Sequence, residues 1–472
     1  MFFTSLSFVV LTLVLWVVYY IRIFRPYQVW MLIAASIYIY WENSGWYTLL
    51  LIFSVVTNAI LSYRLAHSNA FSVRKWLVTA GVLLNVATLA FFKYGYLFAS
   101  SLTNNSSGIN RFFMSLALPA GISFFTFEGI SLLVDTYKKK NAGHTAIMPP
   151  TFSQHLQQSS LFISFFPHLF AGPILRANSF FPQIGSKMLR DIDLEYCFRK
   201  LVAGYFLKMV VANNLYNFTL ALQSPYMEGL SSFTLFTLMA GYLIQLFADF
   251  AGYTKIALGI AGLFGYRLDE NFNYPFVAAS LTEFWRRWHM TLSSFLRYYV
   301  YTTWLGNGRR GKTRALFNIF ITMVIGGFWH GTQWTFALWG VMHGGGLVAE
   351  HFLTKYIRLP RKWMSRSLGW FITLLFITMS LTLFKFATLK DVYIYLSSLL
   401  SNYMLPNDNR LVANVLLYAA PVILMHLLYR SHRFSTHTEA IYKRADFALY
   451  GIMLFCIITN SGQASSFIYF KF

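Results

Sequence analysis

The chain has 472 residues, of which 57% are hydrophobic and only 11% are charged. A soluble domain usually carries about 25% charged residues, so this composition excludes an ordinary soluble protein and favours helices embedded in a membrane. The apolar runs are continuous rather than alternating, which argues against a β-barrel. The net charge of +22 does not indicate nucleic-acid binding, because the basic residues fall in short clusters between the apolar runs.

The apolar runs predict an all-α polytopic membrane protein with about 11–12 transmembrane helices. In chain order, the predicted spans are 2–20, 28–40, 46–63, 76–98, 112–136, 201–222, 232–264, 315–329, 334–353, 367–386, 411–429 and 446–461. The first span lacks a basic start and a small-residue cleavage site, so we expect it to be retained. We interpret residues 1–472 as a single membrane-embedded domain, with N-terminal spans in 1–136, a core in 137–353 and C-terminal spans in 354–472.

The clusters of Lys and Arg predict which loops face the cytoplasm. They lie in alternate loops, near 22–25, 64–75, 138–140, 309–314, 355–366 and 430–445. The loops "WENSGW" and "SLTNNSSG" are nearly free of basic residues, and we expect them outside. The alternation holds if the stretch 152–175 enters the membrane and returns as a re-entrant segment, because Pro167 and Gly172 break a simple span.

Residues 281–301 show a different pattern, which predicts an amphipathic helix along the cytoplasmic interface. One side of this helix carries Glu283, Arg286, Arg287, Ser294 and Arg297. The other side carries Trp285, Trp288, His289, Leu292, Phe295, Leu296 and Tyr299. His289 is therefore expected to face the protein interior or the lipid boundary.

His330 lies in the apolar stretch "GGFWHGTQWTF". The helix from the basic loop to this histidine has about 16 residues and is roughly 24 Å long, less than the hydrocarbon thickness of about 30 Å. We therefore expect His330 at the tip of a hairpin, below the outer membrane surface. Burial there favours the neutral imidazole, which can accept a proton from a hydroxyl or thiol in acyl transfer.

A structural role is the alternative for each of three histidines. His330 can hydrogen-bond between helices, and His289 can anchor its helix by packing. His343 lies in "WGVMHGGG", where three glycines favour close helix packing. Cys197 and Cys456 are far apart and indicate neither a disulfide framework nor a metal site. We expect no metal and no permanently bound cofactor.

The motifs resemble those of the membrane-bound O-acyltransferases, in particular their bacterial alginate O-acetyltransferase-like branch. The D-alanyl transferases of teichoic acid are more distant relatives. The resemblance rests on "LPAGISFFTFEGISLLVDTYK", "FFPHLFAGPILR", "GYFLKMVVANNL", "QLFADFAGYTKIALGIAGLFGYRLDENFNYPF", "FWRRWHMTLSSFLRYYVY", "GGFWHGTQWTFALWGVMHG" and the closing "FIYFKF". It covers essentially the whole chain, and the order of "FWRRWH" and "WHG" is highly specific.

The resemblance implies that His330 is the catalytic histidine and His289 its companion, in a tunnel between the two membrane faces. Trp285, Trp329, His343 and Asp249 are further candidates for the tunnel wall. The chain departs from the family pattern at Glu128, at Lys255 and in the "ANN" at 212–214. Because unpaired charges inside a membrane are costly, Glu128 and Lys255 can pair with each other or with Asp249. The alternative is that each faces a wet cavity separately.

The expected activity is export of an acetyl group from a cytoplasmic thioester, acetyl-CoA, to a polysaccharide of the cell envelope or secreted from the cell. The expected location is the inner (cytoplasmic) membrane, where the multi-pass chain contacts membrane lipid. Transfer of D-alanine or to a small molecule, and transport of a lipid-linked sugar without catalysis, remain alternatives. A transporter is disfavoured because no inverted repeat is found.

A separate extracytoplasmic partner is also expected, an acetyltransferase or hydrolase-like protein. The outward loops near 41–46, 99–111, 223–231 and 401–410 are short. They offer little surface to hold a polymer and carry no Ser-His-Asp set that could complete the transfer outside. Relatives in this branch are encoded with such partners. No nucleic-acid partner is expected.

Overall fold

The computed structural model describes residues 3–102, 108–141, 149, 151–170, 172–306, 311–356, 362–432 and 438–463. Every regular element in these ranges is a helix, which confirms the all-α prediction. The chain forms two compact units, Met1–Phe198 with Ile256–Asp269 and Arg199–Lys255 with Glu270–Phe472. The interpretation of the chain as a single membrane-embedded domain stays a prediction.

The first unit is a bundle of helices joined by short turns. Its α-helices are α1 (Leu6–Tyr19), α2 (Gln28–Ser44), α3 (Thr48–His67), α4 (Phe71–Leu102), α5 (Gly108–Ser115), α6 (Ile122–Asn141), α7 (Phe152–Ser164), α8 (Phe166–Leu169) and α9 (Ala177–Phe180). Its 3-10 turns are η1 (Arg22–Tyr27), η2 (Gly45–Tyr47), η3 (Phe181–Gln183) and η4 (Leu189–Asp191).

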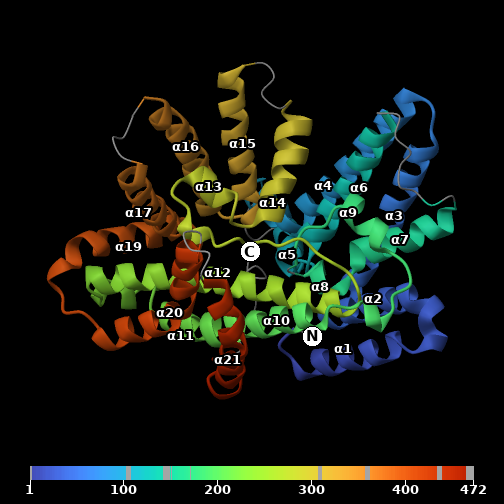
Figure 1. Ribbon diagram of the computed structural model, residues 1–472. Coiled ribbons are helices and arrows are strands. Elements are labelled where there is room, and N and C mark those ends of the chain that lie inside the picture. Colours follow the sequence, from blue (N-terminus) through green and yellow to red (C-terminus); the bar gives the residue numbers. More distant parts are fainter. Residues whose placement is uncertain are drawn as a thin grey trace. The chain divides into compact units, whose positions relative to one another are not determined.

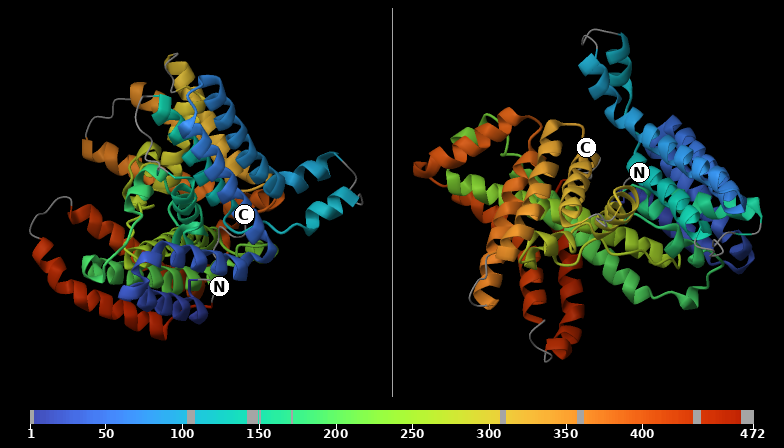
Figure 2. Two further views of the ribbon diagram at one scale, coloured as in Figure 1. Left: turned by 90° about the vertical axis from the view of Figure 1, so that its right-hand side faces the viewer. Right: turned by 90° about the horizontal axis from the view of Figure 1, so that it is seen from above.

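Helices α3, α4 and α6 lie side by side in this unit (Figures 1 and 2). The carboxamides of Asn58 and Asn85 exchange hydrogen bonds of 3.2 and 2.9 Å between α3 and α4. Gly129 of α6 packs onto this pair, because a methyl group there would lie 2.5 Å from Nδ2 of Asn58. Buried polar groups are thus paired within the apolar bundle, as their desolvation requires.

The stretch predicted as a re-entrant segment is broken, as its Pro and Gly indicated. Helix α7 ends at Ser164, and Phe165 leaves helical geometry with ψ 107°. The short helix α8 follows, with Pro167 in its first turn, where a missing N–H costs little. His168 and its neighbours are buried. Whether this segment returns to the same membrane face stays a prediction.

The second unit holds the remaining helices. They are α10 (Leu194–Tyr205, which begins in the first unit), the π-helix η5 (Phe206–Ala212), α11 (Asn213–Thr219), η6 (Tyr226–Gly229), α12 (Ser232–Leu263, which ends in the first unit), η7 (Pro275–Val277), α13 (Leu281–Trp285), α14 (Met290–Phe295), the π-helix η8 (Leu296–Trp304), α15 (Lys312–His330), α16 (Trp334–Tyr356), α17 (Lys362–Ser380), α18 (Thr382–Lys385), α19 (Leu389–Ser401), η9 (Asn402–Met404), α20 (Asn409–His432) and α21 (Thr438–Thr459).

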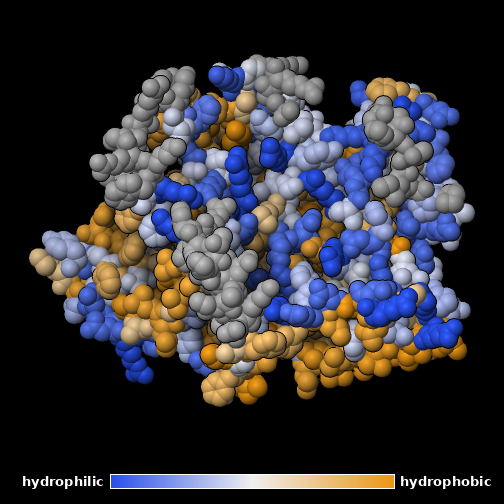
Figure 3. Space-filling model, viewed as in Figure 1, coloured by the Kyte–Doolittle hydropathy of each residue, from blue (hydrophilic) through white to orange (hydrophobic). Residues whose placement is uncertain are grey.

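Five helical stretches of the described residues are long and apolar enough to cross a membrane: Arg22–His67, Phe71–Gly95, Ser232–Leu263, Arg366–Lys385 and Asn409–Arg430. Together with the all-helical fold they identify a polytopic membrane protein. The count of 11–12 spans stays a prediction. Helix α1 adds a shorter apolar face, on which Leu6, Val10, Leu13, Val14 and Val17 are exposed (Figure 3). Such a face is suited to contact with lipid.

Two sequence predictions are wrong in detail. The span predicted at 112–136 is divided between α5 and α6, with residues 116–121 outside either helix. Pro119 and Gly121, which has φ +71°, explain the break. Helix α19 was not predicted, because it is too short to give a span signal. The loops at 103–107, 307–310, 357–361 and 433–437, on which much of the topology prediction rests, lie outside the described residues.

Candidate active site

His330 is the last residue of α15, at the tip of the α15–α16 hairpin. The length of the span predicts that His330 lies at the tip of a hairpin, and the structure confirms this position. The histidine is only 4% exposed. The rings of Trp329, Trp339 and Phe384 surround it edge to face, with centroids 5.0, 5.0 and 5.2 Å away. The apolar walls therefore disfavour a charged imidazole.

Glycines set the position of this tip by letting the backbones of α15 and α16 touch. A methyl group at Gly327 would lie 2.4 Å from the carbonyl oxygen of Phe336. One at Gly340 would lie 2.7 Å from the carbonyl oxygen of Met323, and one at Gly344 would lie 3.0 Å from that of Phe320. The motif "GGFWHG" thus encodes a close hairpin as well as a histidine.

His289 breaks the amphipathic helix that the sequence predicts at 281–301. It adopts left-handed geometry with φ 41° and ψ 53°, uncommon for a residue other than glycine. Backbone bonds hold the turn to a neighbouring segment, from Met290 N–H to Asn271 O (2.9 Å) and from Asn273 N–H to Arg287 O (2.9 Å). The segment is therefore α13, a turn, α14 and a π-helix, rather than one continuous helix.

The two predicted catalytic histidines meet at one tryptophan. His289 is fully buried and packs edge to face on Phe250 (4.6 Å) and on Trp329 (5.9 Å). The Trp329 ring also packs on His330, its neighbour in sequence, with ring centroids 5.0 Å apart. His289 lies between helices, outside the predicted spans, and burial lowers its pKa to about 3. It is therefore neutral at physiological pH.

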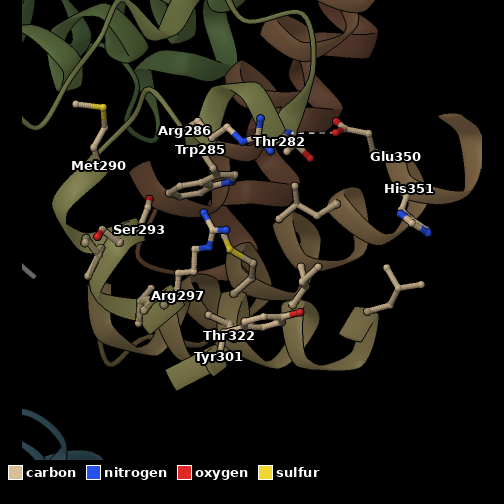
Figure 4. A pocket seen from close by; sticks show the side chains of 18 of the residues that line it. Thr282, Trp285, Arg286, Met290, Ser293, Arg297, Tyr301, Thr322, Glu350 and His351 are labelled. Atoms are coloured by element: carbon tan, nitrogen blue, oxygen red, sulfur yellow. Dashed lines mark hydrogen bonds between the residues drawn. The ribbon is translucent and has the colours of Figure 1, made fainter. Parts of the chain in front are cut away.

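A cavity of about 630 Å³ reaches His330 from the open end of the hairpin (Figure 4). Its walls come from α13, α14, η8, α15 and α16. Arg286 and Arg297 line it, and the guanidinium of Arg297 reaches toward the ring of Trp285. The Glu350 carboxylate accepts hydrogen bonds from the N–H groups of Leu281 (2.5 Å) and Thr282 (3.2 Å). This contact ties the start of α13 to α16.

A second, narrow pocket of about 20 Å³ lies beyond His330, lined by side chains of α12, α13, α16 and α17. Three residues line both the cavity and this pocket: Trp285, His330 and Trp339. They form the neck between the two spaces. Nε1 of Trp285 and Nε1 of Trp339 are buried and have no acceptor among the described residues. Unsatisfied buried donors of this kind are rare, which points to a role in the site.

His343, a candidate for the tunnel wall, lines the narrow pocket but also joins two helices. Its Nε2 lies 3.0 Å from Oγ of Ser380 on α17. The Ser380 hydroxyl donates its proton to the carbonyl of Ile377, so its oxygen accepts from His343 Nε2–H. The ring also packs on Trp339 (4.3 Å) and Trp285 (5.4 Å). These contacts agree with the alternative that His343 has a structural role, and they place its ring next to the neck.

Asp249, another candidate for the tunnel wall, lies outside the set of residues that line these two spaces. Its Oδ1 lies 2.6 Å from Nζ of Lys208, and both side chains are buried. Lys208 belongs to the π-helix η5, which packs against Gly252 of α12. Of the two alternatives for Glu128 and Lys255, pairing with Asp249 is wrong, because Asp249 forms its salt bridge with Lys208. Glu128 lies in the first unit, with Oε1 3.2 Å from Nδ1 of His168.

Sequence reasoning missed Trp339 and Phe384, which contact His330 from other helices. Trp339 stands one helical turn before His343, a spacing that places both on one face of α16. No local signal marks Phe384. Among the described residues no group of three or more metal-ligating side chains is found.

Residues 70–389 match the sequence profile of the membrane-bound O-acyltransferase family, MBOAT. The chain belongs to this family. The match contains His289, His330, His343 and the residues of the neck. This membrane-bound O-acyltransferase is therefore an enzyme.

Individual relatives agree with this assignment. A peptidoglycan O-acetyltransferase of Helicobacter pylori is 31% identical, over 94% of this chain and 91% of the relative. A protein of Pseudomonas aeruginosa named "Probable alginate O-acetylase AlgI" is 34% identical, over 79% of this chain and 69% of the relative. A teichoic acid D-alanyltransferase of Bacillus subtilis is 30% identical, over 56% of this chain and 67% of the relative. The alginate-like branch of the family is thus supported.

Proposed function

We propose that this O-acyltransferase moves an acetyl group from cytoplasmic acetyl-CoA across the inner membrane, for O-acetylation of an envelope or secreted polysaccharide. The observation that carries the proposal is the place of His330, in a neck between a basic cavity and an aromatic pocket. The names of the two O-acetylating relatives support glycan hydroxyls as the final acceptors.

The larger cavity suits the donor. Its volume of about 630 Å³ lies within the usual range for small-molecule sites, about 300–1,000 Å³. The guanidinium groups of Arg286 and Arg297 suit the phosphates of coenzyme A, because a planar guanidinium donates paired hydrogen bonds that match the oxygens of a phosphate. The cavity opens at the end of the hairpin next to the basic loop 309–314, which the charge pattern places in the cytoplasm.

The chemistry assigned to His330 is general base catalysis. Its imidazole accepts the proton of the attacking hydroxyl, and the hydroxyl oxygen forms a bond with the thioester carbonyl carbon. The tetrahedral intermediate then expels the thiolate as the C–S bond breaks, and the imidazolium returns the proton to sulfur. His289 acts through Trp329, whose ring both imidazoles contact, and so positions the base.

The indole N–H groups of Trp285 and Trp339 are suited to the negative charge that develops on the carbonyl oxygen. They are buried donors without an acceptor among the described residues, on the same neck as the base. Donors fixed in place before the reaction stabilise such an oxyanion without reorganisation. A pocket of about 20 Å³ holds little more than one water molecule, so the neck must widen for the acyl group to pass.

A partner outside the membrane completes the transfer in this proposal. Between α11 and α12 the described outward loop is short, with only η6, and between α19 and α20 with only η9. Such loops leave little surface to hold a polymer. We propose that a separate extracytoplasmic protein with its own nucleophile docks near 331–334 and receives the acetyl group.

Proteoliposomes test the proposal. The purified chain is reconstituted and given acetyl-CoA labelled in the acetyl group on the cytoplasmic side only. Release of labelled acetyl to a hydroxyl acceptor in the lumen is expected from the wild type and not from His330→Phe. A D-alanyl thioester replaces acetyl-CoA in a parallel sample. Faster transfer of D-alanine than of acetyl would contradict the acetyl assignment.

The partner requirement has its own test. The chain, acetyl-CoA and polysaccharide are mixed without any other protein. Little acetylation of the polymer is expected. Efficient acetylation in this three-component mixture would rule out the partner.

A further inference from the structure

A separate cavity of about 400 Å³ lies in the second unit, bounded by α12, the segment 270–274 and α20. Its volume is within the range of small-molecule sites, about 300–1,000 Å³. The apolar part of its wall includes Phe247, Phe272, Tyr274 and Met425. The acyl-transfer proposal gives no role to this cavity.

Two lysines and one glutamate line the same cavity. Lys200 of α10 forms a salt bridge with Glu270. Lys255 of α12 has no hydrogen-bond or ion-pair partner among the described residues. The lining therefore carries one net positive charge, located on Lys255.

The charge of Lys255 lies where an uncompensated charge is costly. It lies in α12, one of the helices long and apolar enough to cross a membrane. An ammonium group in such a helix is costly unless it meets a counter-charge or a wet cavity. The buried Lys208, on a helix packed against α12, meets that requirement with Asp249. Lys255 forms no such salt bridge, because the Glu270 carboxylate on the same cavity wall is already paired with Lys200, and the ammonium group of Lys255 lines the cavity.

We propose that this cavity is a second ligand site, which binds an organic phosphodiester with one negative charge. Its anionic oxygen is bound by Lys255, and its apolar part packs on Phe247, Phe272 and Met425. The single charge of a phosphodiester matches the net charge of the lining, whereas a phosphate monoester brings nearly two. The phosphodiester of a lipid headgroup and a soluble phosphodiester share this chemistry.

The cavity adjoins the acyl-transfer site but is distinct from it. Met290 lines both this cavity and the larger one that reaches His330. Otherwise the two sets of lining residues differ. A ligand of this cavity should therefore bind without competing with acetyl-CoA.

The experiment measures binding and needs no turnover, so its failure is separate from failure of the proposed acyl transfer. The full chain in neutral detergent is titrated with phosphatidylglycerol and, in parallel, with soluble glycerophosphoglycerol, with diacylglycerol, which has no phosphate, as the uncharged control. Native mass spectrometry gives the Kd for each. Lys255→Met removes the charge at similar length. Lys390→Met, on the exposed surface of α19, is the matched control.

Because the contact between Lys255 and the anionic oxygen is charge-assisted, we expect Lys255→Met to raise the Kd about tenfold or more and Lys390→Met to leave it unchanged. Glu270→Gln releases Lys200 from its salt bridge and should lower the Kd, a gain that misfolding cannot imitate. Binding of the lipid alone identifies a lipid source, and binding of both probes identifies a soluble one. Absence of binding by either probe, an unchanged Kd in Lys255→Met, or displacement by acetyl-CoA would overturn the proposal.

Discussion

Two buried histidines of the first unit differ in their surroundings from two of the second unit, His289 and His330. In the first unit each has a polar partner: Nε2 of His155 lies 2.8 Å from Oγ of Ser62, and His168 lies against the Glu128 carboxylate. In the second unit, aromatic rings pack edge to face against His289 and His330. Of these four, only His330 lines a cavity described here.

This difference shows that burial alone does not identify a catalytic histidine. All four residues are almost completely buried. A histidine whose nitrogens are occupied by protein groups has no lone pair for a substrate, whereas one at a cavity wall can exchange a proton with a bound hydroxyl. Access to a cavity is therefore the property that separates His330 from the other three.

The largest expected effect comes from His330. His330→Ala should lower kcat about 10²–10⁴-fold, the usual contribution of a general base, without lowering the amount of folded protein. His155→Gln in the first unit should leave kcat per folded molecule nearly unchanged. Acetyl transfer in proteoliposomes and quantitative immunoblotting of the membranes measure both. Normal acetylation by folded His330→Ala would end the general-base assignment.

Removal of the neck donors should have the next largest effect. Trp339→Phe and Trp285→Phe keep an aromatic ring but lose the indole N–H. Each should lower kcat about 10²-fold with little change in KM, because an oxyanion donor acts on the transition state. Trp288→Phe, outside the neck, is the control. A change in KM alone would assign the two tryptophans to substrate binding.

His289 allows a further comparison with His330 within the second unit. Because burial lowers the pKa of His289 to about 3, its imidazole is already neutral and does not titrate between pH 5 and 9. His289→Gln should therefore lower kcat/KM about tenfold through misplacement of His330, without moving the midpoint of the pH–rate profile. A shift of that midpoint would show that His289 itself titrates during catalysis.

The smallest effect on catalysis is expected at His343, which resembles the paired histidines of the first unit. His343→Ala removes the hydrogen bond to Ser380 and should lower the free energy of unfolding by about 1–3 kcal/mol. The kcat of the protein that remains folded should stay within a few-fold of wild type. His343→Gln, which keeps a donor, should regain part of the stability. A large loss of kcat at normal stability would instead make His343 part of the reaction.

Much of the helical architecture could be predicted, because apolar runs of membrane length leave few alternatives. The position of His330 at a hairpin tip followed from counting the residues between a basic loop and this histidine; its depth in the membrane stays a prediction. The break at His289 could not be predicted, since it depends on backbone bonds to Asn271 and Asn273, which are distant in sequence. Burial of Arg287 on the predicted polar side has a similar origin, because Glu283 and the carbonyl of Asn273 bind its guanidinium.

The neck itself could not be predicted from the sequence. Trp285 precedes His330 and Trp339 by tens of residues, and the packing of α13 and α15 against α16 brings the three together. The pairing of Asp249 with Lys208 was missed for a related reason. Lys208 lies in a π-helix, whose wider turn changes which side chains share a face.

The contact between the backbones of α15 and α16 has a consequence for how an acyl group passes the membrane. Gly327 and Gly340 lock these helices together, and Glu350 fixes the start of α13 to the same frame. Because α15 and α13 are both fixed to α16, these helices cannot rotate apart in the way that the two halves of a transporter do. In the proposed transfer we therefore expect the neck to open by rotation of the indole side chains of Trp285 and Trp339, a movement faster than that of a domain. Such a gate would admit a small acyl group while the helices on either side continue to seal the membrane against ions.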